Sequence, residues 1–235
     1  MQLPLGIKLP DSSTFANFVR GDNDEVVDHV RRCLEKGGDD NAAIYIWGAG
    51  GCGKSHLLQA ACHAVAAAGK ACVYLPLKTA HGQGPEALFP EMLDGLESLA
   101  LICIDDIDVV AADEAWEAAL FHLYNRVHAA GSRLLVAGHA APADLPLQLA
   151  DLRSRLAWGW IFQLQVLADE DKKRALQLRA STRGFDLPDD VSDYLLRYFP
   201  RDMHALFALL DRLDTASVVA QRRLTIPFVK TVLER

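Results

Sequence analysis

One segment constrains the fold of this 235-residue chain more than any other: Gly48–Ser55, GAGGCGKS, fits the pattern G-x-x-x-x-G-K-[ST]. It lies between a short apolar run, Ala43–Trp47, and an alanine-rich helical pattern, His56–Ala68. Glycines let backbone amides turn inward around phosphates, and the following helix adds its N-terminal dipole. We therefore predict a P-loop that binds ADP or ATP, with Lys54 at the β- and γ-phosphates and Ser55 as a ligand of Mg²⁺. The expected nucleotide contacts in this region are Gly48, Gly50, Gly51, Cys52, Gly53, Lys54, Ser55 and His56.

A second signal is the apolar run Leu101–Ile104, which ends in two carboxylates, Asp105 and Asp106. P-loop ATPases place an acid near Mg²⁺ at the end of such a strand. We expect Asp105 to organise the metal and Asp106 to polarise the attacking water, although an aspartate at a strand end also caps turns. Kinases, transporters and helicases share both motifs, so they do not name a reaction. A GTPase is disfavoured because the chain has no N-K-x-D signature.

The pattern along the chain indicates an α/β fold followed by a helical domain. Short apolar runs alternate with helical patterns, which is typical of a parallel five-stranded sheet between helices. From Ala168 onward the strand pattern disappears. The expected strands are Ala43–Trp47, Ala71–Leu75, Leu99–Ile104, Arg133–Ala137 and Ile161–Leu164. The expected helices are Asp24–Glu35, His56–Ala68, Asp113–Ala129, Asp169–Arg183, Asp189–Tyr198, Arg201–Ala220 and Ile226–Leu233.

Composition narrows the class of protein further. The net charge is −7, whereas a domain that grips duplex DNA unaided usually carries a basic stripe. The five cysteines form no CxxC pair and mostly lie in apolar runs, so we expect buried reduced thiols. The eight histidines show no metal-ligand spacing and are expected to be packing or surface residues. The sequence shows no membrane-length apolar stretch and no signal peptide, which predicts a cytoplasmic protein without membrane contact.

A third signal is an arginine pair in the segment Asp151–Gly159, DLRSRLAWG, between the fourth and fifth expected strands. An arginine supplied to a neighbour's γ-phosphate stabilises transition-state charge. A plain surface arginine is the commoner case, but the position after the fourth strand favours a functional role. We expect Arg155 to act as an arginine finger in trans.

Several segments together resemble the DnaA/Hda family of AAA+ proteins. They span nearly the whole chain from Thr14, and two of them resemble the regulators in this family more than the initiators. The family-like segments are Thr14–Asn23, Asp105-Asp106, Ser154–Gly159 and Arg201–Leu206, and the regulator-like ones are Leu123–Arg126 and Leu224–Lys230. The resemblance implies an AAA+ domain at 14–166 and a small α-helical lid domain at 167–235. It also implies that Arg155 is the finger, Arg201 a second-sensor arginine at the phosphates, and Val19 part of the base pocket. One departure is His139, which stands where the family usually has a small polar or acidic sensor.

The first 13 residues read as an extended arm that resembles a sliding-clamp-binding peptide. Leu3, Leu5 and Ile7 would enter an apolar groove while Gln2 bonds at its edge; the alternative is a tail packed on its own domain. Together with a chain that stops at Arg235, before any helix-turn-helix domain of the initiator type, this favours a regulator.

The predicted partners are the initiator DnaA, whose ATP hydrolysis the chain would stimulate, and the polymerase sliding clamp. DNA would be reached only through the clamp, and homo-oligomer formation is left open. The chain's own nucleotide would be structural, with weak intrinsic ATPase activity at most. The alternative is an autonomous AAA+ ATPase such as a helicase-loading or DNA-remodelling factor. A nucleotide kinase is disfavoured.

Overall fold

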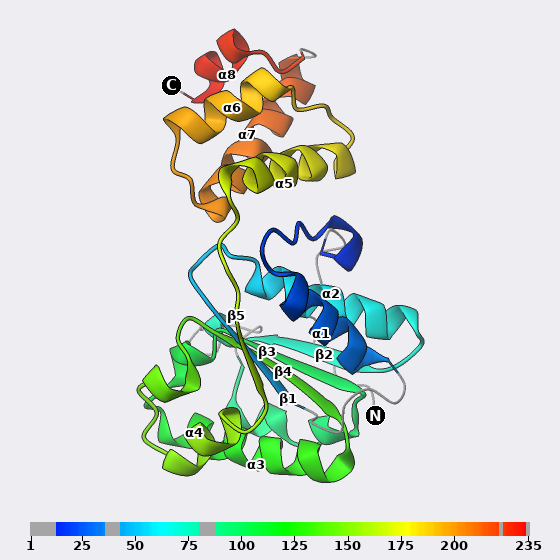
Figure 1. Ribbon diagram of the computed structural model, residues 1–235, viewed down its shortest axis with the longest axis vertical. Coiled ribbons are helices and arrows are strands. Elements are labelled where there is room, and N and C mark those ends of the chain that lie inside the picture. The colour runs from blue at the N-terminus through cyan, green and yellow to red at the C-terminus, as the bar shows by residue number, and fades with distance from the viewer. Residues whose placement is uncertain (1–12, 36–42, 80–87, 221–222, 234–235) are drawn as a thin grey trace.

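The computed structural model of the 235-residue chain describes residues 13–35, 43–79, 88–220 and 223–233. It contains two parts: an α/β part around one sheet and a group of four helices stacked at one end of it (Figure 1). The predicted boundary at 166/167 falls in the stretch between the last strand and the first of these four helices.

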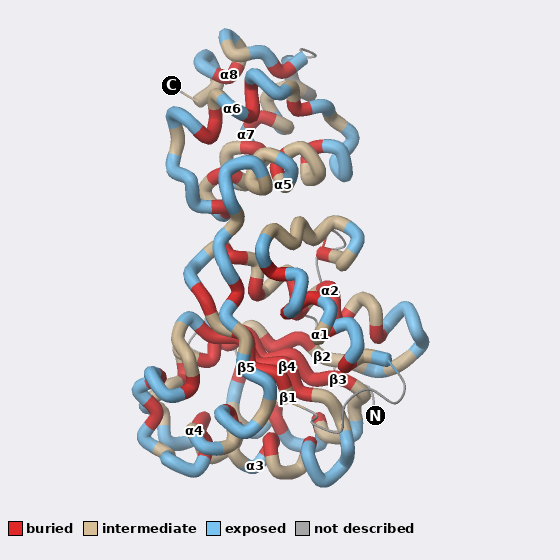
Figure 2. Tube along the Cα trace, in the orientation of Figure 1, coloured by how far each residue is buried: buried red, intermediate tan, exposed pale blue. Residues whose placement is uncertain are grey.

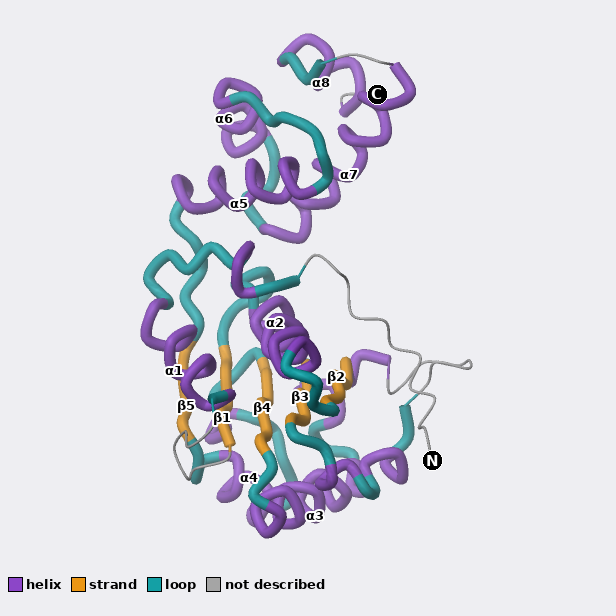
Figure 3. The backbone as a smooth tube through the Cα atoms, turned by 90° about the vertical axis from the view of Figure 1, so that its right-hand side faces the viewer, coloured by secondary structure: helices purple, strands orange, loops and turns teal. Residues whose placement is uncertain are grey.

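The sheet has five parallel strands in the order β2-β3-β4-β1-β5, which Figure 3 shows side by side. The five predicted strands are confirmed, with ends that differ by two residues at most. The strands are β1 (Ala43–Trp47), β2 (Cys72–Pro76), β3 (Leu101–Asp105), β4 (Arg133–Gly138) and β5 (Trp160–Gln163). Strand β1, which leads into the predicted P-loop, lies between β4 and β5.

Seven of the helices match the sequence-based prediction, and an eighth, α4, does not. The α/β part contains α1 (Asp24–Leu34), α2 (Lys54–Ala67), α3 (Glu114–Ala130) and α4 (Ala150–Leu156). The helical part contains α5 (Asp169–Thr182), α6 (Asp189–Tyr198), α7 (Met203–Ala220) and α8 (Ile226–Leu233). The prediction that α7 begins at Arg201 was wrong by two residues, because the Asp202 carboxylate accepts the backbone N–H of Ala205 at 3.0 Å and so caps the helix.

The strands alternate their side chains between two helical layers. Ile44 and Ile46 of β1 pack with α1 and α2, while Tyr45 between them packs with α3 and α4. The same alternation continues through β3, where Cys103 faces α2 and Ile104 faces α3. Figure 2 shows the central strands buried, as expected for a parallel sheet covered on both faces. The core therefore fixes the ends of the strands, where the predicted motifs lie.

Helix α4 is positioned by one buried carboxylate. Glu117 of α3 is 1 % exposed and accepts three backbone N–H groups, from Ala112 at 2.7 Å, Gln148 at 3.1 Å and Leu149 at 2.6 Å. Leu149 is the residue that precedes α4, and its side chain makes no capping bond. The start of this seven-residue helix thus depends on a side chain from another helix.

The segment that leads from β5 to the helical part is held by hydrogen bonds on both sides. The backbone N–H of Leu164 donates to the carbonyl of Trp47 at 2.7 Å, next to the P-loop. The side chain of Asn23, 2 % exposed, accepts the N–H of Gln165 at 2.7 Å and donates to its carbonyl at 3.1 Å. Beyond this point Val166 is 58 % exposed.

The structure also bears on two expectations from composition. All five cysteines carry free thiols, and four of them are buried, as predicted. Over the described part of the chain, the helices are too short or too polar to cross a bilayer.

Candidate nucleotide-binding site

The P-loop lies where the sequence predicts it, between the end of β1 and the start of α2. Gly48 passes so close to the β5 side that a Cβ atom there would lie 2.5 Å from the carbonyl oxygen of Leu164. Gly53 has φ +105°, a backbone conformation that residues with a Cβ rarely adopt, and packs against the ring of Phe18. The loop therefore needs glycine at these two positions for steric reasons.

Lys54 extends back over the loop. It is 6 % exposed, and its ammonium donates to the carbonyl oxygens of Gly48 at 2.7 Å and Ala49 at 3.0 Å. With the first amides of α2, it provides the positive charge and donors that a di- or triphosphate requires.

The loop forms one wall of a cavity of about 540 Å³ between the α/β part and the helical part. The N-terminal segment with Phe18 and Val19, the P-loop from Gly50 to His56, and side chains of α5 and α7 line it. This volume is in the range typical of sites for small ligands. Val19, His56 and Asp106 thus line one cleft, whereas Gly48 is not among its described lining residues.

Asp105 lies behind the cleft at the end of β3 and is 1 % exposed. One carboxylate oxygen accepts the hydroxyl of Tyr74 at 2.7 Å, and the other accepts the backbone N–H of Asp106 at 3.0 Å. Burial raises the pKa of Asp105, against the hydroxyls of Ser55 and Tyr74, which lower it. A carboxylate beside the Ser55 hydroxyl is a donor set of hard oxygens, which fits Mg²⁺.

Asp106 adopts a left-handed conformation with φ 55° and lies 3.3 Å from the Lys78 ammonium. The Asp108 carboxylate makes two hydrogen bonds to His139. One oxygen accepts the backbone N–H of His139 at 2.7 Å, and the other lies 2.9 Å from its Nδ1. Within the described ranges, oxygens of Asp106 and Asp108 and a ring nitrogen of His139 come within 4.8 Å of one another. The spacing of the histidines along the chain does not indicate this group, because β3 and β4 meet only in the folded sheet.

On the helical part, the sequence predicts Arg201 at the phosphates, but other residues line the cleft. Arg201 is 61 % exposed, pairs with Asp169 at 2.9 Å, and is not among the described residues that line the cleft. Two other arginines, Arg179 and Arg183 on α5, do line it, together with Asp211 of α7. The sequence pattern does not single them out, because α5 is rich in charged residues and a cleft-facing arginine cannot be told from a solvated one.

Arg155 lies away from this cleft. It is on α4, which Figure 1 shows beside α3, on the side of the sheet opposite α1 and α2. Its guanidinium carbon lies 5.0 Å from the ring centre of Trp158, which is 55 % exposed. The neighbouring Arg153 donates instead to the carbonyl of Leu147, a contact within its own loop. Of the arginine pair, Arg155 is therefore the better placed to reach another molecule.

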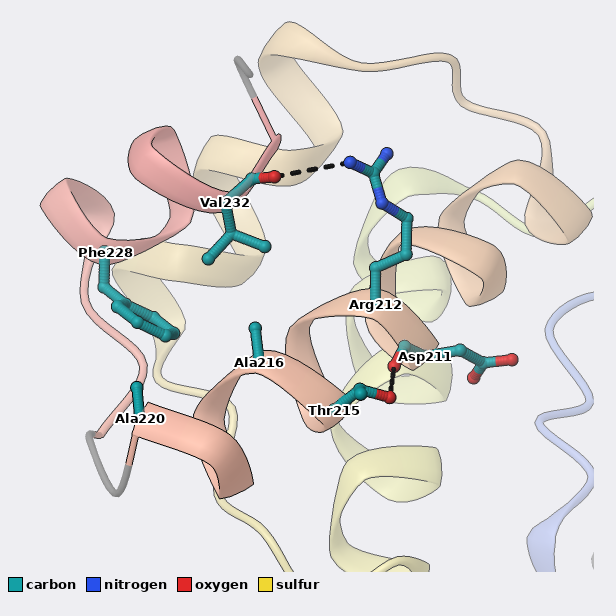
Figure 4. Close-up of a pocket in the computed structure, with 7 residues that line it drawn as sticks. All are labelled: Asp211, Arg212, Thr215, Ala216, Ala220, Phe228 and Val232. Carbon is teal, nitrogen blue, oxygen red and sulfur yellow. Dashed lines mark hydrogen bonds between the residues drawn. The ribbon is translucent and has the colours of Figure 1, made fainter.

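A second hollow lies on the helical part, between α7 and α8 (Figure 4). It is lined mainly by apolar groups such as Ala216, Phe228 and Val232, and Arg212 crosses it to donate to the carbonyl of Val232 at 3.3 Å. It contains no P-loop residue among its described lining, so it is separate from the cleft where the sequence predicts the nucleotide. Gln2, Leu3, Leu5 and Ile7 of the predicted clamp-binding peptide lie outside the described residues.

The sequence and the fold of this chain are similar to those of known proteins. A model of the bacterial DnaA ATPase domain matches residues 9–163, and a model of the Hda lid domain matches residues 169–233. Domain III of the Thermotoga maritima initiation protein DnaA superposes with TM-score 0.81 at 20% identity, covering 97% of this chain and 98% of that one. AMPPCP-bound DnaA from Aquifex aeolicus gives TM-score 0.70 at 22% identity, covering 89% and 67%. The Holliday junction branch migration motor RuvB of Thermotoga maritima gives 0.64 at 18%, covering 92% and 72%.

Proposed function

Because the chain belongs to the bacterial DnaA ATPase-domain family and carries an Hda-type lid, we propose that it is a nucleotide-bound regulator of the replication initiator DnaA. In this proposal it stimulates ATP hydrolysis on DnaA through Arg155 and so prevents re-initiation. Its own nucleotide serves to fix the lid against the α/β part.

The observation that carries the proposal is the position of Arg155. This arginine lies on α4, outside the cleft that contains its own P-loop, beside an exposed tryptophan. An arginine there lies outside the cleft of its own chain, and the half-buried Arg155 side chain beside exposed Trp158 would meet a nucleotide held by a second molecule. In well-studied cases such a finger raises the rate of hydrolysis by about 10³–10⁵-fold.

The proposed ligand of the chain's own cleft is ADP or ATP with Mg²⁺. Lys54 and the P-loop amides would hold the phosphates, and the oxygens of Ser55 and Asp105 would hold the ion, which neutralises phosphate charge. Support comes from the donor set described above and from the related DnaA structures, which contain AMPPCP. ADP is the proposed resting nucleotide, because the regulator needs no turnover of its own.

The proposed second partner is the polymerase sliding clamp, bound by Gln2, Leu3, Leu5 and Ile7. This part rests on the resemblance of the sequence alone. The net charge of −7 supports an indirect route to DNA, through the clamp, because the phosphate backbone attracts basic surfaces.

The experiment is a measurement of phosphate release from ATP-loaded DnaA, with the chain present and the clamp loaded on DNA. We expect stimulation by the wild-type chain, loss of that stimulation with Arg155→Ala, and loss when the clamp is omitted. Arg197→Ala, a change to another arginine beside an aromatic ring but on the lid, is the matched control. If stimulation survives Arg155→Ala, or occurs equally without DnaA, the proposal fails.

A second candidate is an autonomous AAA+ ATPase, such as a helicase-loading or DNA-remodelling factor. The observation in its favour is that Lys54, Asp105 and Asp106 are all present at one end of the sheet. Robust ATP turnover by the isolated chain, stimulated by single-stranded DNA and abolished by Asp106→Asn, would favour this candidate over the regulator.

A further inference from the structure

Arg179 projects from α5 into the wall of the cleft that faces the P-loop. Its guanidinium carbon lies 4.4 Å from the ring centre of Phe207 on α7, a stacking contact that holds the planar group in place. The side chain is 31 % exposed. It is therefore fixed by packing against the lid core rather than extended into solvent.

The donors of Arg179 are incompletely used. Its Nε atom is buried and has no hydrogen-bond partner, although buried polar groups of proteins are almost always paired. The nearest carboxylate, Asp211, lies 3.8 Å from Arg179 but 2.5 Å from Arg183, which takes the closer contact. Burial lowers the pKa of Arg179, and the like charge of Arg183 adds to this effect. The side chain as a whole is 31 % exposed and lines the cleft, so the rest of its guanidinium is open to an acceptor there.

Across from Arg179, the described lining of the cleft includes His56 and Phe18. His56, at the first turn of α2, directs Nε2 away to the carbonyl of Thr14 at 3.0 Å and to the side chain of Asn17 at 3.1 Å. The ring of Phe18 meets the ring of His56 edge to face, with centroids 5.2 Å apart. Phe18, Val19 and Phe207 therefore give part of the cleft flat or apolar walls, with Arg179 as a donor beside the predicted phosphate-binding loop.

We propose that Arg179 is the residue that recognises the nucleoside part of the bound nucleotide. Its guanidinium donates to a ring nitrogen of adenine, whose N1, N3 and N7 are acceptors, while the phosphates lie at Lys54. The base lies between Phe18 and Val19 on one side and the α5–α7 wall on the other. This inference rests on the proposed nucleotide site, but it does not depend on the action of the chain on DnaA.

The test compares ADP with pyrophosphate, which keeps the phosphates and removes the nucleoside. Dissociation constants are obtained from the rise of the thermal unfolding midpoint with ligand concentration in the presence of Mg²⁺, a readout that reaches weak ligands. We expect Arg179→Ala to weaken ADP binding about tenfold or more, as for one charge-assisted hydrogen bond, and to leave pyrophosphate binding within about twofold.

Two further variants serve as a matched control and as a test of the guanidinium shape. Arg174→Ala removes an arginine of the same helix that is 76 % exposed and outside the cleft, and it should bind ADP as the wild type does. Arg179→Lys keeps the charge but removes the planar fork, and it should lose ADP affinity nearly as much as the alanine variant. Pyrophosphate binding shows that each variant is folded.

Two results would overturn the proposal. Unchanged ADP affinity in both Arg179 variants would mean that Arg179 contacts no part of the ligand. An equal loss for ADP and pyrophosphate would make Arg179 a phosphate ligand. If the wild type binds neither compound, the nucleotide site itself is wrong, whereas a failure to stimulate DnaA with ADP binding intact refutes only the regulator.

Discussion

The buried carboxylate of Glu117 offers the most stringent test of how α4, the helix that carries Arg155, is held in place. It is 1 % exposed and accepts three backbone N–H groups, including that of Leu149 at the start of α4. Glu117→Gln keeps the shape of the side chain but replaces one acceptor oxygen with an amide that can only donate. We expect this change to destabilise the protein and to loosen α4.

The magnitude follows from these three bonds. If the remaining oxygen of the glutamine keeps Ala112 and Gln148, the bond at Leu149, 2.6 Å in the structure, is lost. The two retained bonds also lose their charge assistance, so the gross loss is on the order of 4 kcal/mol. Burying a neutral amide instead of a carboxylate offsets about 2 kcal/mol of this. The expected net destabilisation is about 2 kcal/mol, or a midpoint lower by roughly 4–8 °C for a chain of this size.

Urea and thermal unfolding of the nucleotide-free protein measure this effect, and DnaA-dependent phosphate release measures its consequence at Arg155. The control is Glu114→Gln, an exposed glutamate one turn earlier on α3, which should change stability by less than about 0.5 kcal/mol. If Glu117→Gln is as stable as this control, the three hydrogen bonds do not hold α4 and the reasoning is wrong.

Three shorter predictions concern the cleft. Lys54→Ala should weaken ADP binding at least about tenfold in the thermal-shift titration; unchanged affinity would place the phosphates elsewhere. Gly48→Ala should cost about 1–3 kcal/mol in urea unfolding because its Cβ would lie 2.5 Å from the oxygen of Leu164, while Gly50→Ala, whose Cβ meets nothing within 4 Å, should be neutral. Burial lowers the pKa of His56 from its ordinary 6.5, so below about that pH the unfolded chain binds a proton that the folded protein does not. Stability should therefore fall as the pH drops below about 6.5, and His56→Gln should flatten this slope between about pH 7.5 and 5.5.

The features predicted correctly from the sequence are those that local patterns determine. The position of the glycine-rich loop is predictable because glycine, lysine and serine occur at fixed spacing between an apolar run and a helical one. The position of Asp105 at the end of β3 is predictable because an apolar run precedes it. Helix α4 escapes prediction because it is seven residues long and begins after Leu149, which cannot cap it. Its start is defined by Glu117, 32 positions earlier in the sequence.

The residues that line the cleft from the lid could not be predicted, because their positions also depend on tertiary packing. Arg179 and Arg183 belong to a helix whose charged residues surround it, so no periodicity marks the face that turns to the cleft. His139 follows β4 and Asp108 lies in the short 3₁₀ helix after β3, so the two meet only through the β3–β4 pairing. The positions of these residues follow from tertiary packing, which one sequence does not reveal.

The hydrogen-bonded segment after β5, Leu164 and Gln165, limits how the lid can move. The P-loop and this segment leave the sheet from neighbouring strands, joined by the bond between Leu164 and Trp47, and Asn23 fixes Gln165 from the other side. We therefore expect any rotation of the lid to come from the backbone dihedrals of the three residues from Val166 to Ala168, before α5 begins. Because this short segment is anchored beside the predicted P-loop, we expect a small change in the backbone there to produce a large displacement at the far end of the lid.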